Sequence, residues 1–191
     1  MVKLHRPLLL ATASEARRSL VKSLGINFTP CSVDIDESVL PGESLTVFVE
    51  RLAKAKVLAV HLPSPEAIVI AADTAIGFEG EIMGKADDEL AARSMLERFS
   101  ENTHLVATAI AIRDDLHAKI NVETTITEIC MSKLTPEMIA WYLSTGEWRG
   151  KAGAYGIQEK GAALVAEIRG CLTNVIGISL SSLLNMLARV R

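Results

Sequence analysis

Runs of apolar residues divide the chain into short strands and amphipathic helices. The clearest run, Ala-Ile-Val-Ile-Ala-Ala at 67–72, is short and bears β-branched residues, which predicts a strand buried on both faces. Glu79-Gly80 separates 74–78 from 81–83 and is typical of a two-residue hairpin turn. Further strands are predicted at 8–11, 28–33, 103–113, 117–131, 164–168 and 173–178, with 103–131 forming a long antiparallel hairpin.

Apolar residues at a period near 3.6 predict helices at 14–25, 43–60, 87–99, 135–146 and 179–190. Ser14 is the expected N-cap of the first helix. The turn before it presents backbone N–H groups and the positive end of the helix dipole, and Arg17 and Arg18 add charge, which suits a phosphate. The alternative is an ordinary capped helix with solvated arginines.

The size and composition of the chain narrow the classes of function. With 191 residues, 49% of them hydrophobic, we expect one compact domain, 1–191, of two closely joined lobes. A net charge of −3 and 4% aromatic residues argue against nucleic acid or a membrane as a partner. Three widely spaced cysteines predict neither disulfides nor a zinc site. The apolar part of the amino-terminus is too brief for a signal peptide, so we expect a cytoplasmic protein.

Acidic residues follow two of the predicted strands. Asp73 is expected to leave the end of the buried strand, where a rigidly held carboxylate can act as a base or hold a cation. Lys85 returns near it after the hairpin. A carboxylate from the acidic segment 34–38 could join Asp73 to hold Mg²⁺. The alternatives are an Asp that caps a turn, a solvated acidic loop, and a phosphatase-type nucleophile motif, Asp34-x-Asp36-x-Ser38.

The segment 147–157 combines glycines, cations and aromatic residues in a composition typical of a ligand-shaping loop. A mobile surface loop is the alternative interpretation. Lys56, on the helix 43–60, is by itself an ordinary cation on a solvated helix face.

Taken in order, these motifs resemble the Maf family of nucleoside triphosphate pyrophosphatases over essentially the whole chain. The resemblance rests on the following segments: Leu-Ala-Thr-Ala-Ser at 10–14 with Arg17, the acidic loop 33–37, Arg-Leu-Ala-x-x-Lys at 51–56, Ile-Ala-Ala-Asp-Thr at 70–74, Gly-Lys at 84–85, Thr-His at 103–104, Gly-Glu at 146–147, and Lys-Ala-Gly-Ala-Tyr-Gly-Ile-Gln at 151–158.

The resemblance implies an α/β fold of the inosine-triphosphatase-like type, with a mixed, curved β-sheet flanked by helices and a cleft between two lobes. It implies a cytoplasmic homodimer that hydrolyses a nucleoside triphosphate to a monophosphate and pyrophosphate with Mg²⁺ or Mn²⁺. The roles carried over are these: Asp73 as proton acceptor, Glu37 and Asp73 as metal ligands, Ser14, Arg17, Lys56 and Lys85 on the triphosphate, and Thr74 and Gln158 at positions that accompany dTTP and UTP preference.

One position departs from the family pattern. Ala16 stands where the first of two arginines is usual, and Arg18, one position beyond the second, could reach the same phosphates. Pyrimidine triphosphates remain the expected substrates. The second hypothesis, prompted by the lost arginine, is a nucleotide-binding regulator of cell division or septum formation with residual catalysis.

Overall fold

The computed structural model describes residues 6–190 of the chain. The prediction that the chain has no signal peptide rests partly on residues 1–5, which lie outside the described residues. The strands are β1 (Leu8–Ala11), β2 (Thr29–Cys31), β3 (Ile68–Phe78), β4 (Glu81–Met83), β5 (Thr103–Asp114), β6 (Lys119–Met131) and β7 (Val165–Arg169).

These strands form one mixed sheet of seven strands in the order β2-β1-β3-β5-β6-β7, with β4 paired to β3. β1 pairs in parallel with β2 and with β3, while β3, β5, β6 and β7 are antiparallel neighbours. β5 and β6 form the predicted long hairpin. The prediction of a mixed α/β sheet flanked by helices is confirmed.

Six helices belong to the described residues, and their bounds are α1 (Glu15–Ser23), α2 (Leu45–Ala59), α3 (Glu89–Phe99), α4 (Pro136–Ser144), α5 (Leu172–Ile176) and α6 (Leu180–Ala188). Ser14 caps α1 by accepting a hydrogen bond from the Arg17 backbone N–H, and Thr135 caps α4 in the same way. These caps satisfy backbone donors that a helix leaves free at its start. Two short 3₁₀ segments, Asp115–His117 and Glu159–Leu164, complete the chain.

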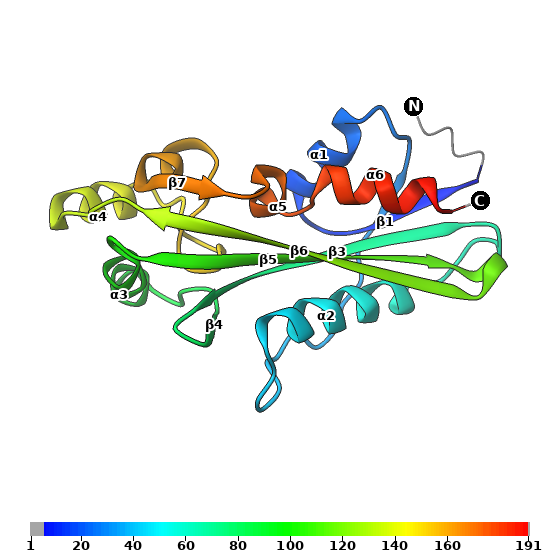
Figure 1. Cartoon of the computed structure of the whole chain (residues 1–191), viewed down its shortest axis with the longest axis horizontal. Coiled ribbons are helices and arrows are strands. Elements are labelled where there is room, and N and C mark those ends of the chain that lie inside the picture. The colour runs from blue at the N-terminus through cyan, green and yellow to red at the C-terminus, as the bar shows by residue number, and fades with distance from the viewer. Residues whose placement is uncertain (1–5, 191) are drawn as a thin grey trace.

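The residues of β3 alternate between the two faces of the sheet. Val69, Ala71 and Ala75 pack on the face that α2 covers, and Ile68 and Ile70 pack on the face covered by α1 and α6. Figure 1 shows α2 on one side of the long strands and α1, α5 and α6 on the other. Since successive side chains in a strand point to opposite faces, neighbouring residues of β3 serve different layers.

A third apolar cluster lies toward one end of the long strands. It includes Phe99 of α3, Tyr142 of α4 and Met83 of β4. Figure 1 shows α3 and α4 at this end, away from α6. β3 and β5 run through both regions, since Ile76 and Val106 belong to this cluster while earlier residues of β3 belong to the other two. The sheet therefore links two packed regions.

Two sequence predictions were wrong. The buried strand does not end before Asp73, because β5 pairs with β3 without interruption from Ile68 to Gly77. The segment 173–178, predicted as a turn and a strand, instead contains most of the helix α5, which ends at Ile176 and is followed by Gly177 at a φ of 138°.

Candidate active site

A cleft of about 720 Å³ opens where one edge of β3 loses its neighbour. β1 pairs with this edge as far as Ala71, and β4 pairs with it from Ile76 onward. Across the interval 72–75, no described strand covers the edge. The cleft therefore reaches side chains from both faces of the sheet, including Asp73 on one face and Thr74 on the other.

On the α2 side, two carboxylates converge on one ammonium group. Lys56 Nζ lies 2.5 Å from Asp73 Oδ1 and 2.7 Å from Glu37 Oε1. Lys56 comes from the last turn of α2, and Glu37 comes from the loop between β2 and α2. An ammonium has three N–H donors, so one donor of Lys56 is left for a ligand.

The two carboxylates have different electrostatic environments. Burial raises the pKa of Asp73, and this effect outweighs the opposing charges of Lys56 and Arg17. Partial burial acts in the same direction on Glu37, but the hydrogen bond from Lys56 and the charges of Lys56, Lys85 and Arg17 prevail, so the pKa of Glu37 is lowered. The pKa shifts of the two carboxylates therefore run in opposite directions, and the upward shift at Asp73 suits a proton acceptor.

On the opposite side of β3, Arg17 is fixed by two hydrogen bonds. Its Nε donates to the Gly177 carbonyl at 2.7 Å, and its Nη2 donates to Thr74 Oγ1 at 2.9 Å. Burial lowers the pKa of Arg17, against the charges of Asp73 and Glu37, yet a guanidinium stays protonated in proteins. Three of its five N–H donors remain for a ligand, next to the amino-terminus of α1 at Ser14.

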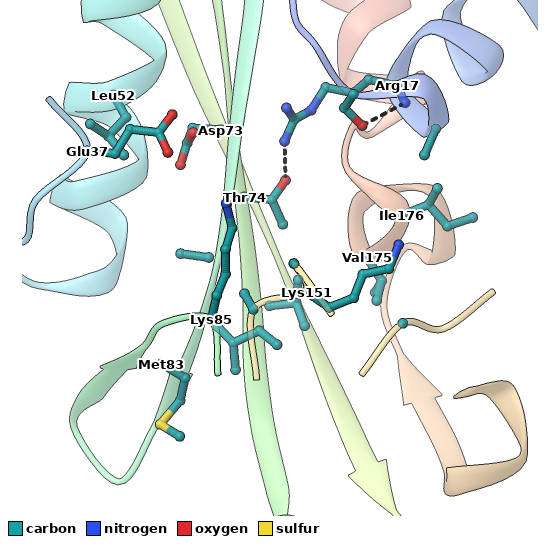
Figure 2. A pocket seen from close by; sticks show the side chains of 18 of the residues that line it. Arg17, Glu37, Leu52, Asp73, Thr74, Met83, Lys85, Lys151, Val175 and Ile176 are labelled. Atoms are coloured by element: carbon teal, nitrogen blue, oxygen red, sulfur yellow. Dashed lines mark hydrogen bonds between the residues drawn. The ribbon is translucent and has the colours of Figure 1, made fainter. Parts of the chain in front are cut away.

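Two more cations line the cleft. Lys85 follows β4, and Lys151 belongs to the loop 147–157, whose Ala152 forms a β-bridge with Lys85. Within residues 6–190, neither ammonium has a carboxylate within ion-pair distance. Figure 2 shows Glu37 and Asp73 on one side, Arg17 joined to Thr74 on the other, and Lys85 pointing into the space near Asp73 and Thr74. An anionic ligand is therefore complementary to this cleft.

All eight residues proposed from the sequence line this one cleft: Ser14, Arg17, Glu37, Lys56, Asp73, Thr74, Lys85 and Gln158. Ala16 also lines it, whereas Arg18 does not; the Arg18 guanidinium instead lies 2.5 Å from Glu15 Oε2 at the surface. Asp34 and Asp36 lie outside the lining, so the structure gives no support to the nucleophile motif.

Sequence reasoning missed the contribution of α5 and a buried polar chain behind Thr74. Val175 and Ile176 of α5 line the cleft, and they were assigned to a strand. Thr74 Oγ1 lies 2.8 Å from Thr108 Oγ1, which donates to the Asn174 carbonyl at 2.9 Å. These residues are far apart in the sequence, so no local pattern could have identified the chain.

The donor chemistry of the cleft fits a hard divalent cation. Glu37 and Asp73 share one ammonium and must therefore lie near each other, and Mg²⁺ typically takes one or two carboxylates with water and phosphate oxygens. No group of three or more His, Cys, Asp or Glu side chains suited to a metal is present in the described part of the chain. A cation here would take its remaining ligands from water and substrate.

The fold and this cleft define an α/β protein with a site for an anionic ligand at a break in a mixed sheet. The chain belongs to the Maf-like protein family, which it matches over residues 7–190.

Individual relatives resemble the chain over nearly its whole length. A dTTP/UTP pyrophosphatase of Syntrophomonas wolfei is 39% identical, covering 94% of this chain and 95% of the relative. A dTTP/UTP pyrophosphatase of Anaeromyxobacter dehalogenans is 41% identical, covering 95% and 93%. A solved HAM1 protein from Coxiella burnetii is more distant, with a TM-score of 0.46, 12% identity, and coverage of 66% of this chain and 73% of that one. The family assignment does not depend on it.

Proposed function

We propose that this protein hydrolyses nucleoside triphosphates to nucleoside monophosphates and pyrophosphate, with dTTP and UTP as preferred substrates. The main support for this proposal is that Asp73, Glu37 and Lys56 converge in one cleft. Three further cations, Arg17, Lys85 and Lys151, line the same cleft. The relatives of the same family that bear the name dTTP/UTP pyrophosphatase support the substrate class.

The reaction needs a nucleophilic water on one side of the α-phosphorus and charge neutralisation on the other. Asp73 accepts the proton of the water, and its raised pKa strengthens it as a base. The water oxygen bonds to the α-phosphorus, the P–O bond to the β-phosphate breaks, and pyrophosphate leaves with the bonding electron pair. Arg17, Lys85 and Lys151 neutralise the oxygens on which negative charge develops.

Glu37 and Asp73 would hold the Mg²⁺ or Mn²⁺ that we propose as the cofactor. When bound, such a cation supplies charge neutralisation for phosphate oxygens and lowers the pKa of water. Lys56 already bonds to both carboxylates, so it fixes their orientation, and its charge favours the ionised form of each.

The proposed cellular context is that of a cytoplasmic homodimer, on the basis of the family resemblance. In residues 6–190 no helix is long and apolar enough to cross a membrane. Size-exclusion chromatography with light scattering tests the dimer directly.

The decisive experiment incubates the pure protein with a panel of triphosphates and Mg²⁺ or Mn²⁺ and identifies the products. We expect monophosphate and pyrophosphate, with dTTP and UTP turned over fastest. Release of orthophosphate with a diphosphate product would contradict the proposal. Tight triphosphate binding without turnover would favour the regulatory alternative.

Asp73→Asn removes the proton acceptor and keeps the side-chain volume. We expect kcat to fall by at least about 100-fold, the smaller end of what a general base contributes, with an unchanged circular dichroism spectrum. Asp34→Asn is the matched control, because Asp34 is an exposed carboxylate outside the cleft. Wild-type rates in Asp73→Asn would exclude the assigned role, and loss of activity in Asp34→Asn would revive the nucleophile motif.

A further inference from the structure

A chain of hydrogen bonds runs from the cleft into the interior of the protein. Arg17 Nη2 donates to Thr74 Oγ1 at 2.9 Å, Thr74 Oγ1 lies 2.8 Å from Thr108 Oγ1, and Thr108 Oγ1 lies 2.9 Å from the carbonyl oxygen of Asn174. Thr74 Oγ1 also lies 3.4 Å from the Gly177 carbonyl. Thr108 is 1% exposed, so water does not compete for its hydroxyl.

The number of protons fixes the direction of this chain. A hydroxyl has one proton to donate and two lone pairs to accept with. The Asn174 carbonyl can only accept, so Thr108 donates its one proton to that carbonyl. In the contact between the two threonines, Thr74 must then be the donor, since two oxygens at 2.8 Å need a proton between them.

Thr74 consequently has no proton left for a ligand. One lone pair of its oxygen accepts from Arg17, the other has no donor within the described residues, and Thr74 lines the cleft. Phosphate oxygens accept hydrogen bonds, so an oxygen that can only accept is a poor partner for the triphosphate tail. It suits a ligand N–H, and among the pyrimidines uracil and thymine carry a proton on N3 whereas cytosine carries a lone pair there.

We propose that Thr108 is a specificity-determining positioning residue. By accepting the hydrogen bond that Thr74 donates, it leaves Thr74 able only to accept from a ligand, which favours the ring N–H of uracil or thymine and disfavours cytosine. This inference rests on the proposed function and adds the atomic basis of the choice of base. Thr108 acts through Thr74, because Thr108 itself is buried behind the cleft.

The test compares kcat/KM for UTP with kcat/KM for CTP in the wild type, Thr108→Val and Thr108→Ser. Valine keeps the branched shape without the hydroxyl, so the Thr74 proton is released from Thr108 and becomes available to the cytosine N3, with the Gly177 carbonyl, 3.4 Å away, as the competing acceptor. We expect the UTP to CTP ratio to fall about tenfold in Thr108→Val, the effect of one hydrogen bond. Serine keeps the hydroxyl, and its ratio should stay within about threefold of the wild type.

The ratio does not depend on the fraction of folded protein, so partial unfolding of a variant does not obscure it. Thr108→Ala provides the same test if valine is not tolerated. Thr125→Val is the matched control, because Thr125 pairs with Thr108 across the sheet but its hydroxyl contacts Ser182 and not Thr74; its ratio should equal that of the wild type.

Two results would overturn the inference. An unchanged UTP to CTP ratio in Thr108→Val would show that Thr74 does not read the base; an equal loss on both substrates, expected if Thr74 contacts the ribose, is one form of this result. A ratio that falls equally in Thr108→Ser would assign the effect to packing. Failure of the wild type to release pyrophosphate from any triphosphate would instead refute the proposed function.

Discussion

His104 is a buried histidine whose protonation should destabilise the fold. Its ring stacks on Phe99 with centroids 4.4 Å apart, and its Nε2 lies 2.8 Å from the hydroxyl of Tyr155. Its Nδ1 is buried and has no hydrogen-bond partner within the described structure. A protonated ring would place an N–H at Nδ1 with nothing to accept it.

Burial lowers the pKa of His104 to about 4. In the unfolded chain the pKa is about 6.5, so acid protonates the unfolded state first. The contribution of His104 to stability is therefore complete above the unfolded value and is lost as the pH falls toward the folded value. At about 1.4 kcal/mol for each pKa unit, the total loss is about 3 kcal/mol, of which about 2 kcal/mol falls between pH 7 and pH 5.

The assay is urea denaturation of the wild type and of His104→Gln at pH 7 and pH 5. Glutamine is less stable overall because it loses the ring stacking, but it does not titrate. The loss of unfolding free energy between the two pH values should therefore be smaller in His104→Gln than in the wild type by about 2 kcal/mol. His61→Gln, at an exposed histidine, controls for the removal of an imidazole.

Equal pH dependence in the wild type and His104→Gln would refute this reasoning. An NMR titration of the folded protein gives an independent measurement, and a His104 pKa near 6.5 would show that the ring is not isolated from water. Asp114 does not contribute to the pH dependence of stability between pH 7 and pH 5. Its bonds to Arg6 hold the pKa of that carboxyl well below its usual range, so its contribution to the unfolding free energy changes only at lower pH.

Two further predictions concern the cleft and the 3₁₀ segment Glu159–Leu164. Ala16→Arg should raise kcat/KM for dTTP and UTP several-fold, because Ala16 lines the cleft and an arginine there adds a phosphate-binding cation; an unchanged or lower value would mean that the inferred register is wrong. Gly161→Ala should destabilise the protein by about 3 kcal/mol in chemical denaturation, because its Cβ would lie 1.7 Å from the Gly156 carbonyl oxygen. Gly84→Ala meets nothing within 4 Å and should be close to neutral; equal loss in both would refute the steric argument.

The helices and most strands could be predicted because their signals are local. Ser14 was expected to cap the first helix, and it accepts the predicted backbone hydrogen bond. The hairpin turn at Glu79-Gly80 was also predicted, and both residues have the positive φ, 51° and 82°, that such a turn requires. In each case the chemistry that fixes the conformation lies within a few residues.

The errors arise where distant parts of the chain decide the structure. Asp73 looked like the end of a strand because a carboxylate rarely continues a buried apolar run. β5 and the Lys56 ammonium override that preference by supplying backbone pairing and a counter-charge. Similarly, α5 is too short to show a helical period, and its position depends on the bonds of Asn174 to Val106 and Thr127.

The continuation of β3 through Asp73 also explains how the cleft can combine the carboxylates on one face of the sheet with Thr74 and Arg17 on the other. Consecutive residues of a strand point to opposite faces, so Asp73 and Thr74 could not both reach a ligand lying on one face of an unbroken sheet. They both line the cleft because the edge of β3 is open between the pairing regions of β1 and β4. A ligand entering at this edge meets Asp73, Glu37 and Lys56 on the α2 side and Thr74 with Arg17 on the other. The break in strand pairing, more than the end of any strand, is therefore what assembles the site.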